Sequence, residues 1–132
     1  PDELRQYFGT YAERVVLAVL LENTEKKTVI DNFPQILKDL LAVYPNLSLK
    51  LSPKLADQTQ FTYIKTAQAL NISATIVDEA KAHSPYGLIV HSNQAENLDK
   101  VLFSELYPDI LAPSETEPIL EKKGFFAKLF GK

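Results

Sequence analysis

Few side chains in this sequence have the types and spacing that catalysis or metal binding requires. His83 and His91 are the only two histidines, and neither stands at a metal-ligand spacing such as HxxxH. The chain has no cysteine, which excludes a thiol nucleophile, a disulfide framework and a thiolate metal site. We interpret His83 as a solvated loop residue and His91 as the end of a strand. The sequence therefore predicts no catalytic residues, no metal site and no cofactor.

Motifs that bind nucleotide phosphates are also missing. The sequence has no GxxxxGK[ST] loop, no GxGxxG turn and no GxSxG elbow, and its four glycines could hardly build one. Asp78 and Glu79 follow a predicted strand, where carboxylates can hold a cation. Because adjacent side chains diverge along an extended chain, a solvated turn is the better interpretation of this pair.

The strongest candidate for ligand binding is the segment that leads into the first predicted strand. Arg14 is one of two arginines, and a guanidinium at the mouth of a buried strand pairs with a carboxylate or binds an anion bidentately. An ion pair that fixes the strand register is the simpler interpretation. Gly9, Thr10 and Glu13 lie beside Arg14 and complete the candidate ligand-binding set.

The last eleven residues have a composition unlike the rest of the chain. The whole chain has 14 Lys and Arg against 17 Asp and Glu, yet residues 122–132 contain four lysines and no acid. This leaves a charge of +4 on the tail and −7 on residues 1–121. Wound as a helix, the tail would place four large apolar side chains on one stripe flanked by lysines. The candidate membrane- or partner-binding residues are Lys122, Lys123, Phe125, Phe126, Lys128, Leu129 and Phe130.

Basic amphipathic segments of this kind lie on anionic membrane surfaces or dock in hydrophobic grooves. We therefore expect the tail to engage an anionic membrane surface or a protein partner. Two other outcomes stay open, namely a tail that packs on an apolar patch of its own domain or of a second subunit, and a disordered tail. The longest apolar run, residues 15–21, is too short to cross a bilayer as a helix.

Hydrophobic periodicity predicts four strands. Residues 13–21 form a run rich in Val and Leu, which is typical of a strand buried on both faces. Residues 47–51 alternate leucine with Ser48 and Lys50, which indicates a strand with one wet face. Residues 72–77 and 87–90 are the other two predicted strands.

Two amphipathic helices lie between these strands. The first spans residues 29–44, and Pro34 predicts a short helix, a kink near Asn32 and a longer helix to Val43. The second begins at a capping box, with Asp57 as the cap and Gln60 three residues later, and Asn71 is expected to close it in the left-handed conformation. Residues 98–111 mix periods and predict a short helix or an irregular segment.

The element order β-α-β-α-β-β defines the expected fold class, an α+β domain with a mixed four-stranded sheet and packed helices. We expect this domain to span residues 1–111. Residues 112–118 contain two prolines and two acids, so residues 112–121 are predicted to be a flexible linker before the amphipathic tail at 122–132.

Several blocks of residues resemble a known family. Pro1-Asp2-Glu3, Tyr7-Phe8-Gly9-Thr10, Glu13-Arg14-Val15-Val16-Leu17-Ala18, Tyr63-Ile64 and Gly87-Leu88-Ile89-Val90 are similar to the YueI-like family of uncharacterised bacterial cytoplasmic proteins. The resemblance covers about residues 1–92 and implies a fold similar to that of the Bacillus chorismate mutases, which agrees with the element order. It also implies that a polar segment precedes Pro1. It implies no activity.

The sequence thus predicts a cytoplasmic adaptor or regulatory module and not an enzyme. Its tail would bind the module to the surface of a membrane or to a protein partner. Homo-oligomerisation is compatible with this role. One alternative is a small-molecule-binding protein or enzyme with a site near Arg14. Another is an RNA-binding module that uses Asn23, Lys26 and Lys27, at a strand-to-helix junction comparable to that of the kink-turn-binding ribosomal proteins. The acidic body argues against nucleic acid, because phosphate contacts dominate its binding.

Overall fold

The computed structural model describes residues 7–78 and 84–111. The predictions for Glu79, His83, the linker at 112–121 and the tail at 122–132 lie outside the described residues.

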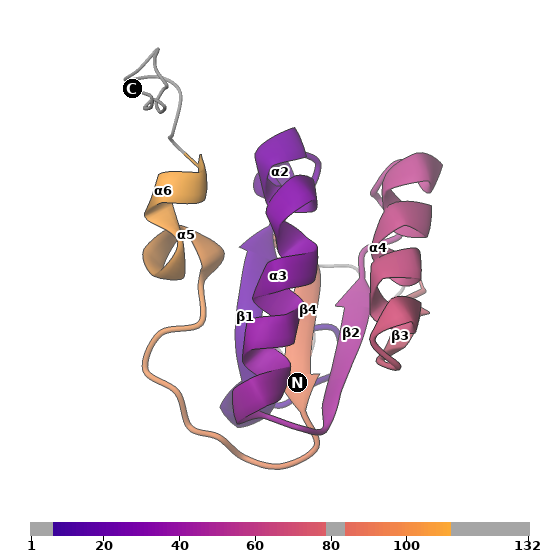
Figure 1. The fold of residues 1–132 in the computed structure, drawn as a ribbon. Coiled ribbons are helices and arrows are strands. Elements are labelled where there is room, and N and C mark those ends of the chain that lie inside the picture. The colour runs from indigo at the N-terminus through magenta and orange to yellow at the C-terminus, as the bar shows by residue number, and fades with distance from the viewer. Residues whose placement is uncertain (1–6, 79–83, 112–132) are drawn as a thin grey trace.

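Four strands form one mixed sheet in the order β1-β4-β2-β3 (Figure 1). They are β1 (Val15–Leu20), β2 (Leu47–Leu51), β3 (Ser73–Ile76) and β4 (Tyr86–Ser92). β4 is antiparallel to both β1 and β2, and β2 is parallel to β3. The helical crossover between β2 and β3 is the connection that a parallel pair requires. The predicted fold class is confirmed.

Helices cover one face of the sheet. In Figure 1, α3 (Lys27–Val43) crosses in front of the strands and α4 (Asp57–Ala69) lies beside it. The main core forms where the apolar stripes of these helices meet the leucines of β2 and the inner residues of β1 and β4. Within it, the rings of Phe33 on α3 and Tyr63 on α4 pack edge to face, with centroids 5.0 Å apart.

The second face of the sheet is covered differently along its width. Over β1 and β4 it carries a smaller apolar cluster, in which Phe8 packs with Val15, Ala18 and Ile89. Over β2, the residues that alternate with the buried leucines are Ser48 and Lys50. The period-2 pattern in the sequence predicted this polar face correctly.

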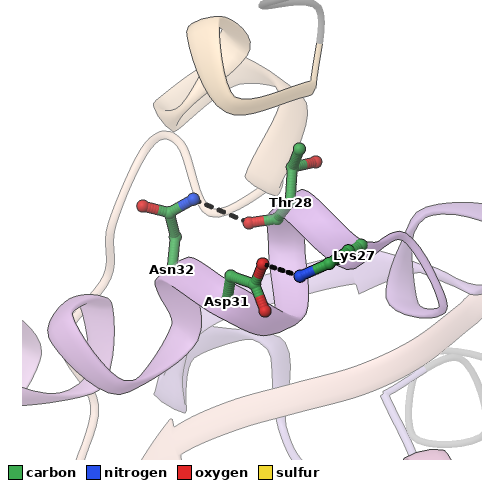
Figure 2. Close-up of polar contacts among 4 residues, drawn as sticks. All are labelled: Lys27, Thr28, Asp31 and Asn32. Atoms are coloured by element: carbon green, nitrogen blue, oxygen red, sulfur yellow. Dashed lines mark hydrogen bonds and ion pairs between the residues drawn. The ribbon is translucent and has the colours of Figure 1, made fainter.

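α3 is one helix from Lys27 to Val43, with Pro34 in its interior, so the predicted division into two helices is wrong. Proline removes one backbone donor, but the buried residues Val29, Phe33 and Leu37 lie on both sides of it and hold the whole helix on the sheet. In the turn before the proline, Asn32 donates its side-chain amide to the carbonyl of Thr28 at 2.7 Å, and Lys27 pairs with Asp31 (Figure 2). Packing thus overrides the local preference.

The predicted capping box of α4 is also not formed. Asp57 is the first helical residue, and the Ala56 cap makes no side-chain hydrogen bond. Instead, the carboxylate of Glu25 accepts hydrogen bonds from the Ala56 backbone amide at 2.8 Å and from the Thr59 hydroxyl. An acidic side chain from another element therefore satisfies the positive end of this helix. The other end agrees with the prediction, because Asn71 has a φ of 60°.

The remaining elements are short. A 3₁₀ turn, η1 (Ala12–Arg14), precedes β1, and the short helix α2 (Leu21–Thr24) follows it. The segment after β4 crosses to the outer edge of β1, where the Ala18 amide donates to the Val101 carbonyl at 2.8 Å. It ends in α5 (Phe103–Leu106) and α6 (Pro108–Leu111), as the prediction of a short helix in residues 98–111 allows.

Candidate functional site

The predicted ligand-binding segment begins with a tight turn. The Thr10 amide donates to the Tyr7 carbonyl at 3.0 Å, and both central residues have positive φ, 57° at Phe8 and 84° at Gly9. Gly9 adopts this conformation without strain, whereas Phe8 adopts it because its ring is buried against the sheet. The turn thereby fixes Thr10, which is 5% exposed, at the approach to β1.

Glu13 and Arg14 lie in η1 with exposed side chains. The Arg14 guanidinium lies over the ring of Tyr11, 5.7 Å from its centroid, and pairs with no carboxylate of the described residues. The ion pair considered for Arg14 is therefore absent from this part of the chain. Glu13 acts through its backbone carbonyl, which accepts from the amides of Glu96 and Asn97 and joins the loop after β4 to the start of β1.

The sequence did not assign His91 or Lys50 to this segment. His91 lies on β4, the strand beside β1, and Lys50 lies on β2, one strand further across the sheet. Val15 pairs with His91 across β1 and β4, and Ser48 pairs with His91 across β2 and β4. Lys50 is two residues beyond Ser48 on the same face, the diagonal position that a long side chain can bridge. His91, predicted to stand at the exit of its strand, is the last residue but one of β4.

The electrostatics of His91 reflect this setting. Burial lowers the pKa of its imidazole below the usual 6.5, the positive charges of Lys50 and Arg14 lower it further, and a hydrogen bond to the Ser92 carbonyl partly opposes them. His91 is therefore neutral at pH 7. Its Nε2 atom and the Thr10 hydroxyl are the buried side-chain polar atoms without a hydrogen-bond partner among the described residues.

The junction considered for RNA binding is largely structural. Asn23 is 6% exposed, and the Thr24 hydroxyl donates to the Leu20 carbonyl at 2.8 Å. The Thr24 carbonyl accepts a hydrogen bond from the buried Tyr63 hydroxyl at 2.7 Å. Of the three residues named for this role, Lys26 and Lys27 are exposed, whereas Asn23 is buried.

One surface hollow lies near the end of the described chain. It has a volume of about 480 Å³ and is lined mainly by apolar side chains of α3, α5 and the segment between β4 and α5, with Leu40, Tyr44, Leu106 and Tyr107 among them. Burial, and to a smaller extent the Asp39 carboxylate, raise the pKa of the Tyr107 phenol. α6 (Pro108–Leu111), the last described element, begins directly after Tyr107 of this lining.

Neither a metal centre nor a membrane span is present in the part of the chain that the structure describes. No three His, Asp or Glu side chains gather there in an arrangement that could hold a metal ion. No helix among residues 7–78 and 84–111 is long and apolar enough to cross a membrane. Asp78, the described member of the carboxylate pair, is exposed just after β3.

The fold defines an α+β protein with a mixed four-stranded sheet, helices on one face, and a second face that is apolar over β1 and β4 and polar over β2. Residues 1–102 match the family described as "Protein of unknown function (DUF1694)", and the chain belongs to this family.

A relative and a solved structure support this membership. The chain is 25% identical over 105 residues to the uncharacterized protein YueI of Bacillus subtilis (strain 168), covering 80% of this chain and 76% of the relative. The crystal structure of that YueI protein matches the fold with a TM-score of 0.67 at 25% identity, over 77% of each chain. The YueI-like resemblance predicted from the sequence is therefore confirmed.

Proposed function

We propose that this chain is an adaptor or regulatory module, not an enzyme, which its C-terminal tail at 122–132 brings to an anionic membrane surface. The observation that carries the proposal is the tail itself, with four lysines, no acid and four large apolar side chains at helical spacing. The domain before it is acidic, so electrostatic attraction to anionic lipid would act on the tail and orient the molecule.

The energetics support reversible binding. Burial of a large apolar side chain contributes about 1.5–3 kcal/mol, so four contribute roughly 6–12 kcal/mol. Ordering ten or so residues costs a similar amount. The lysines decide the balance, because each contributes about 1 kcal/mol near an anionic leaflet. Four lysines then favour anionic over neutral vesicles by roughly a thousandfold.

The domain geometry is compatible with this role. The last described helix, α6, packs against α3, and ten residues separate its end at Leu111 from Lys122. A segment of that length gives the tail the reach to lie on a membrane while the domain stays outside the lipid. The same reach would let the tail fold back into the apolar hollow beside Leu106, and this is the outcome that the experiment must distinguish.

The test is vesicle flotation with the full-length chain. We expect it to float with vesicles containing anionic lipid and to stay in solution with neutral ones. The double variant Phe126→Ser/Phe130→Ser should lose flotation, because it removes two of the four apolar anchors. Phe61→Ser is the matched control, since Phe61 is a 57% exposed phenylalanine on α4 with Lys65 beside its ring.

The control variant should float as well as the unmodified chain. Equal flotation of the unmodified chain and the tail variant would overturn the proposal. So would a fall in thermal stability of the tail variant without any flotation of the unmodified chain, because that pattern indicates a tail packed on its own domain.

A further inference from the structure

The described residues leave one apolar hollow uncovered between α3 and α5. This α3–α5 hollow has a volume of about 480 Å³, which lies within the range of pockets that bind ligands. Its apolar lining consists of Val16, Leu40, Tyr44, Leu98, Leu106 and Tyr107. Val16 is 1% exposed, whereas Leu106 is 36% exposed. The hollow therefore offers burial to apolar side chains that the described residues do not supply.

The charge around the α3–α5 hollow is mostly negative. Asp99 and Lys100 both belong to the lining. Glu105 precedes Leu106 in α5, and Asp109 lies in α6, which packs against α3. Residues 98–111 thus carry three exposed acids and one base, a net charge of −2. Because complementary charge favours association, this surface attracts a basic segment.

Two other hollows among the described residues suit a basic apolar segment less well. One lies between α3 and α4, has a volume of about 350 Å³, and has Lys38 and Lys65 in its lining but no acid. The other has a volume of about 460 Å³ and a lining that includes Asn46, Asn71 and Asn93. The first would repel a basic segment, and the second would leave its apolar side chains against amides. An apolar lining combined with negative charge distinguishes the α3–α5 hollow.

The C-terminal tail at 122–132 has the matching composition and is attached close to this hollow. α6 begins directly after Tyr107 of the lining and ends at Leu111. A helix of four residues is about 6 Å long. The ten residues between Leu111 and the tail span on average roughly 18 Å as a flexible chain. The tail can therefore return to the hollow without any movement of the domain.

We propose that the tail at 122–132 docks in the α3–α5 hollow when no membrane is present, so that the hollow and an anionic lipid surface compete for it. The large apolar side chains of the tail enter the hollow, and its lysines lie near the acids of residues 98–111. The docking itself stands on the composition of the hollow and of the tail. Its role as a switch rests on the membrane binding proposed for the tail.

The short connection makes docking effective even when the contact is weak. Tethering through a linker of this length places the tail at an effective concentration of about 1 mM near the hollow. A hollow that binds the untethered segment with a Kd of about 0.1 mM then holds the tethered tail about nine-tenths of the time. Since only the released tail can bind lipid, docking lowers the apparent affinity of the chain for vesicles about tenfold.

A paramagnetic label on the tail tests the docking in the full-length chain. The chain has no cysteine, so Ala127→Cys provides a single labelling site and keeps the four lysines and four large apolar side chains of the tail. We expect the label to broaden the amide signals of Leu98, Leu106 and their neighbours, relative to the reduced label. Signals around Phe61 should stay sharp, because α4 lies on the other side of α3 from α5 and α6 (Figure 1).

Leu106→Lys tests whether the hollow holds the tail. The change removes an apolar lining residue that is 36% exposed and adds a charge of the same sign as the tail. The broadening should be lost, and half-maximal flotation should need about tenfold less anionic lipid. Phe61→Lys is the matched control, because it adds the same charge at a 57% exposed apolar residue outside the hollow. It should keep the broadening and float like the unmodified chain.

A second variant leaves the lining intact. Glu105→Lys/Asp109→Lys reverses two exposed acids, and it should weaken the broadening and promote flotation in the same direction as Leu106→Lys. Amide spectra of each variant, recorded without the label, confirm that the fold is kept.

The outcomes separate the docking from the membrane function. Broadening that is absent or spread evenly over the domain would overturn the docking, and so would equal broadening in Leu106→Lys and Phe61→Lys. Broadening confined to the hollow, without flotation of any chain, would support the docking and overturn the membrane function. Flotation of the unmodified chain without broadening would support the membrane function and overturn the docking.

Discussion

Replacing Gly87 with alanine tests how closely β4 packs against α2, the short helix after β1. A Cβ atom at position 87 would lie 2.3 Å from the Thr24 hydroxyl oxygen, 2.9 Å from the Thr24 Cβ atom and 3.2 Å from the Leu21 Cα atom. The first two distances are shorter than any tolerated contact, so α2 must move or the strand must bend. Since Gly87 and Thr24 are both buried, neither can turn into solvent.

The expected loss of stability in Gly87→Ala can be taken from the known cost of overpacking a buried site. Forcing a methyl group into a filled site costs about 1–3 kcal/mol. For a chain of this length, each 1 kcal/mol lowers the melting temperature by roughly 3–5 °C. Thr24→Ala alone removes the hydroxyl that donates to the Leu20 carbonyl and should cost about 1 kcal/mol. In the double variant the closest clash is gone, so its cost should be smaller than the sum by about 1 kcal/mol or more.

The assay is a double-mutant cycle by urea denaturation of the four chains. Gly9→Ala provides the control cycle, because a Cβ atom there meets no neighbour and the cost arises only from its φ of 84°. It should be additive with Thr24→Ala. Additivity of Gly87→Ala and Thr24→Ala within about 0.5 kcal/mol would refute the reasoning, because uncoupled residues behave in that way.

Three further predictions concern polar contacts and titration. Glu25→Gln should lower the free energy of unfolding by about 1–2 kcal/mol, because it weakens the charged hydrogen bonds to Thr59 and to the start of α4. Glu22→Gln, which changes a nearby exposed glutamate in the same way, is the control and should have no effect in the same denaturation assay. Tyr63→Phe should cost about 1–3 kcal/mol, since it leaves a buried carbonyl without its donor; a loss below about 0.3 kcal/mol would contradict the buried hydrogen bond. Because the pKa of His91 is lowered on folding, the unfolded chain binds more protons below pH 6.5, so stability should fall as the pH decreases through that value. Denaturation midpoints measured across this range should vary less in His91→Gln, and an identical slope would count against the assignment.

Much of the sheet could be predicted because its strands differ in burial. β1 is buried on both faces and reads as a continuous apolar run, whereas β2 has one wet face and alternates strictly. The close of α4 at Asn71 could be predicted as well, because asparagine tolerates positive φ. In each case the signal lies within a few neighbouring residues.

The two wrong predictions, by contrast, concern structure that depends on residues far apart in the sequence. Pro34 was predicted to break α3, yet contacts with the sheet on both sides of it keep one helix. Asp57 and Gln60 have the spacing of a capping box, but Glu25, 31 residues before Ala56, occupies that role. In both cases a contact with a distant part of the sequence decides the structure. A local sequence pattern carries no information about such a contact.

The candidate site was predicted in part for the same reason. Gly9, Thr10, Glu13 and Arg14 are neighbours in the sequence and share the approach to β1. His91 joins them only because β4 pairs with β1, and Lys50 only because β4 also pairs with β2. The alternation in residues 47–51 predicted that Lys50 faces away from the main core. Its place near His91 depends on the order of the strands, which the sequence did not reveal.

The position of β4 between β1 and β2 has a consequence for synthesis of the chain. The first two strands leave the ribosome well before the strand that joins them, so their inner edges stay unpaired until residues 86–92 emerge. Closure of the sheet then requires contacts across about 70 residues, which slows folding and leaves apolar strand edges open to other nascent chains. A chain that stops before Tyr86 should fail to fold, even though it contains both long helices, and rare codons or stalling just before β4 should reduce the soluble yield more than the same pause after Ser92.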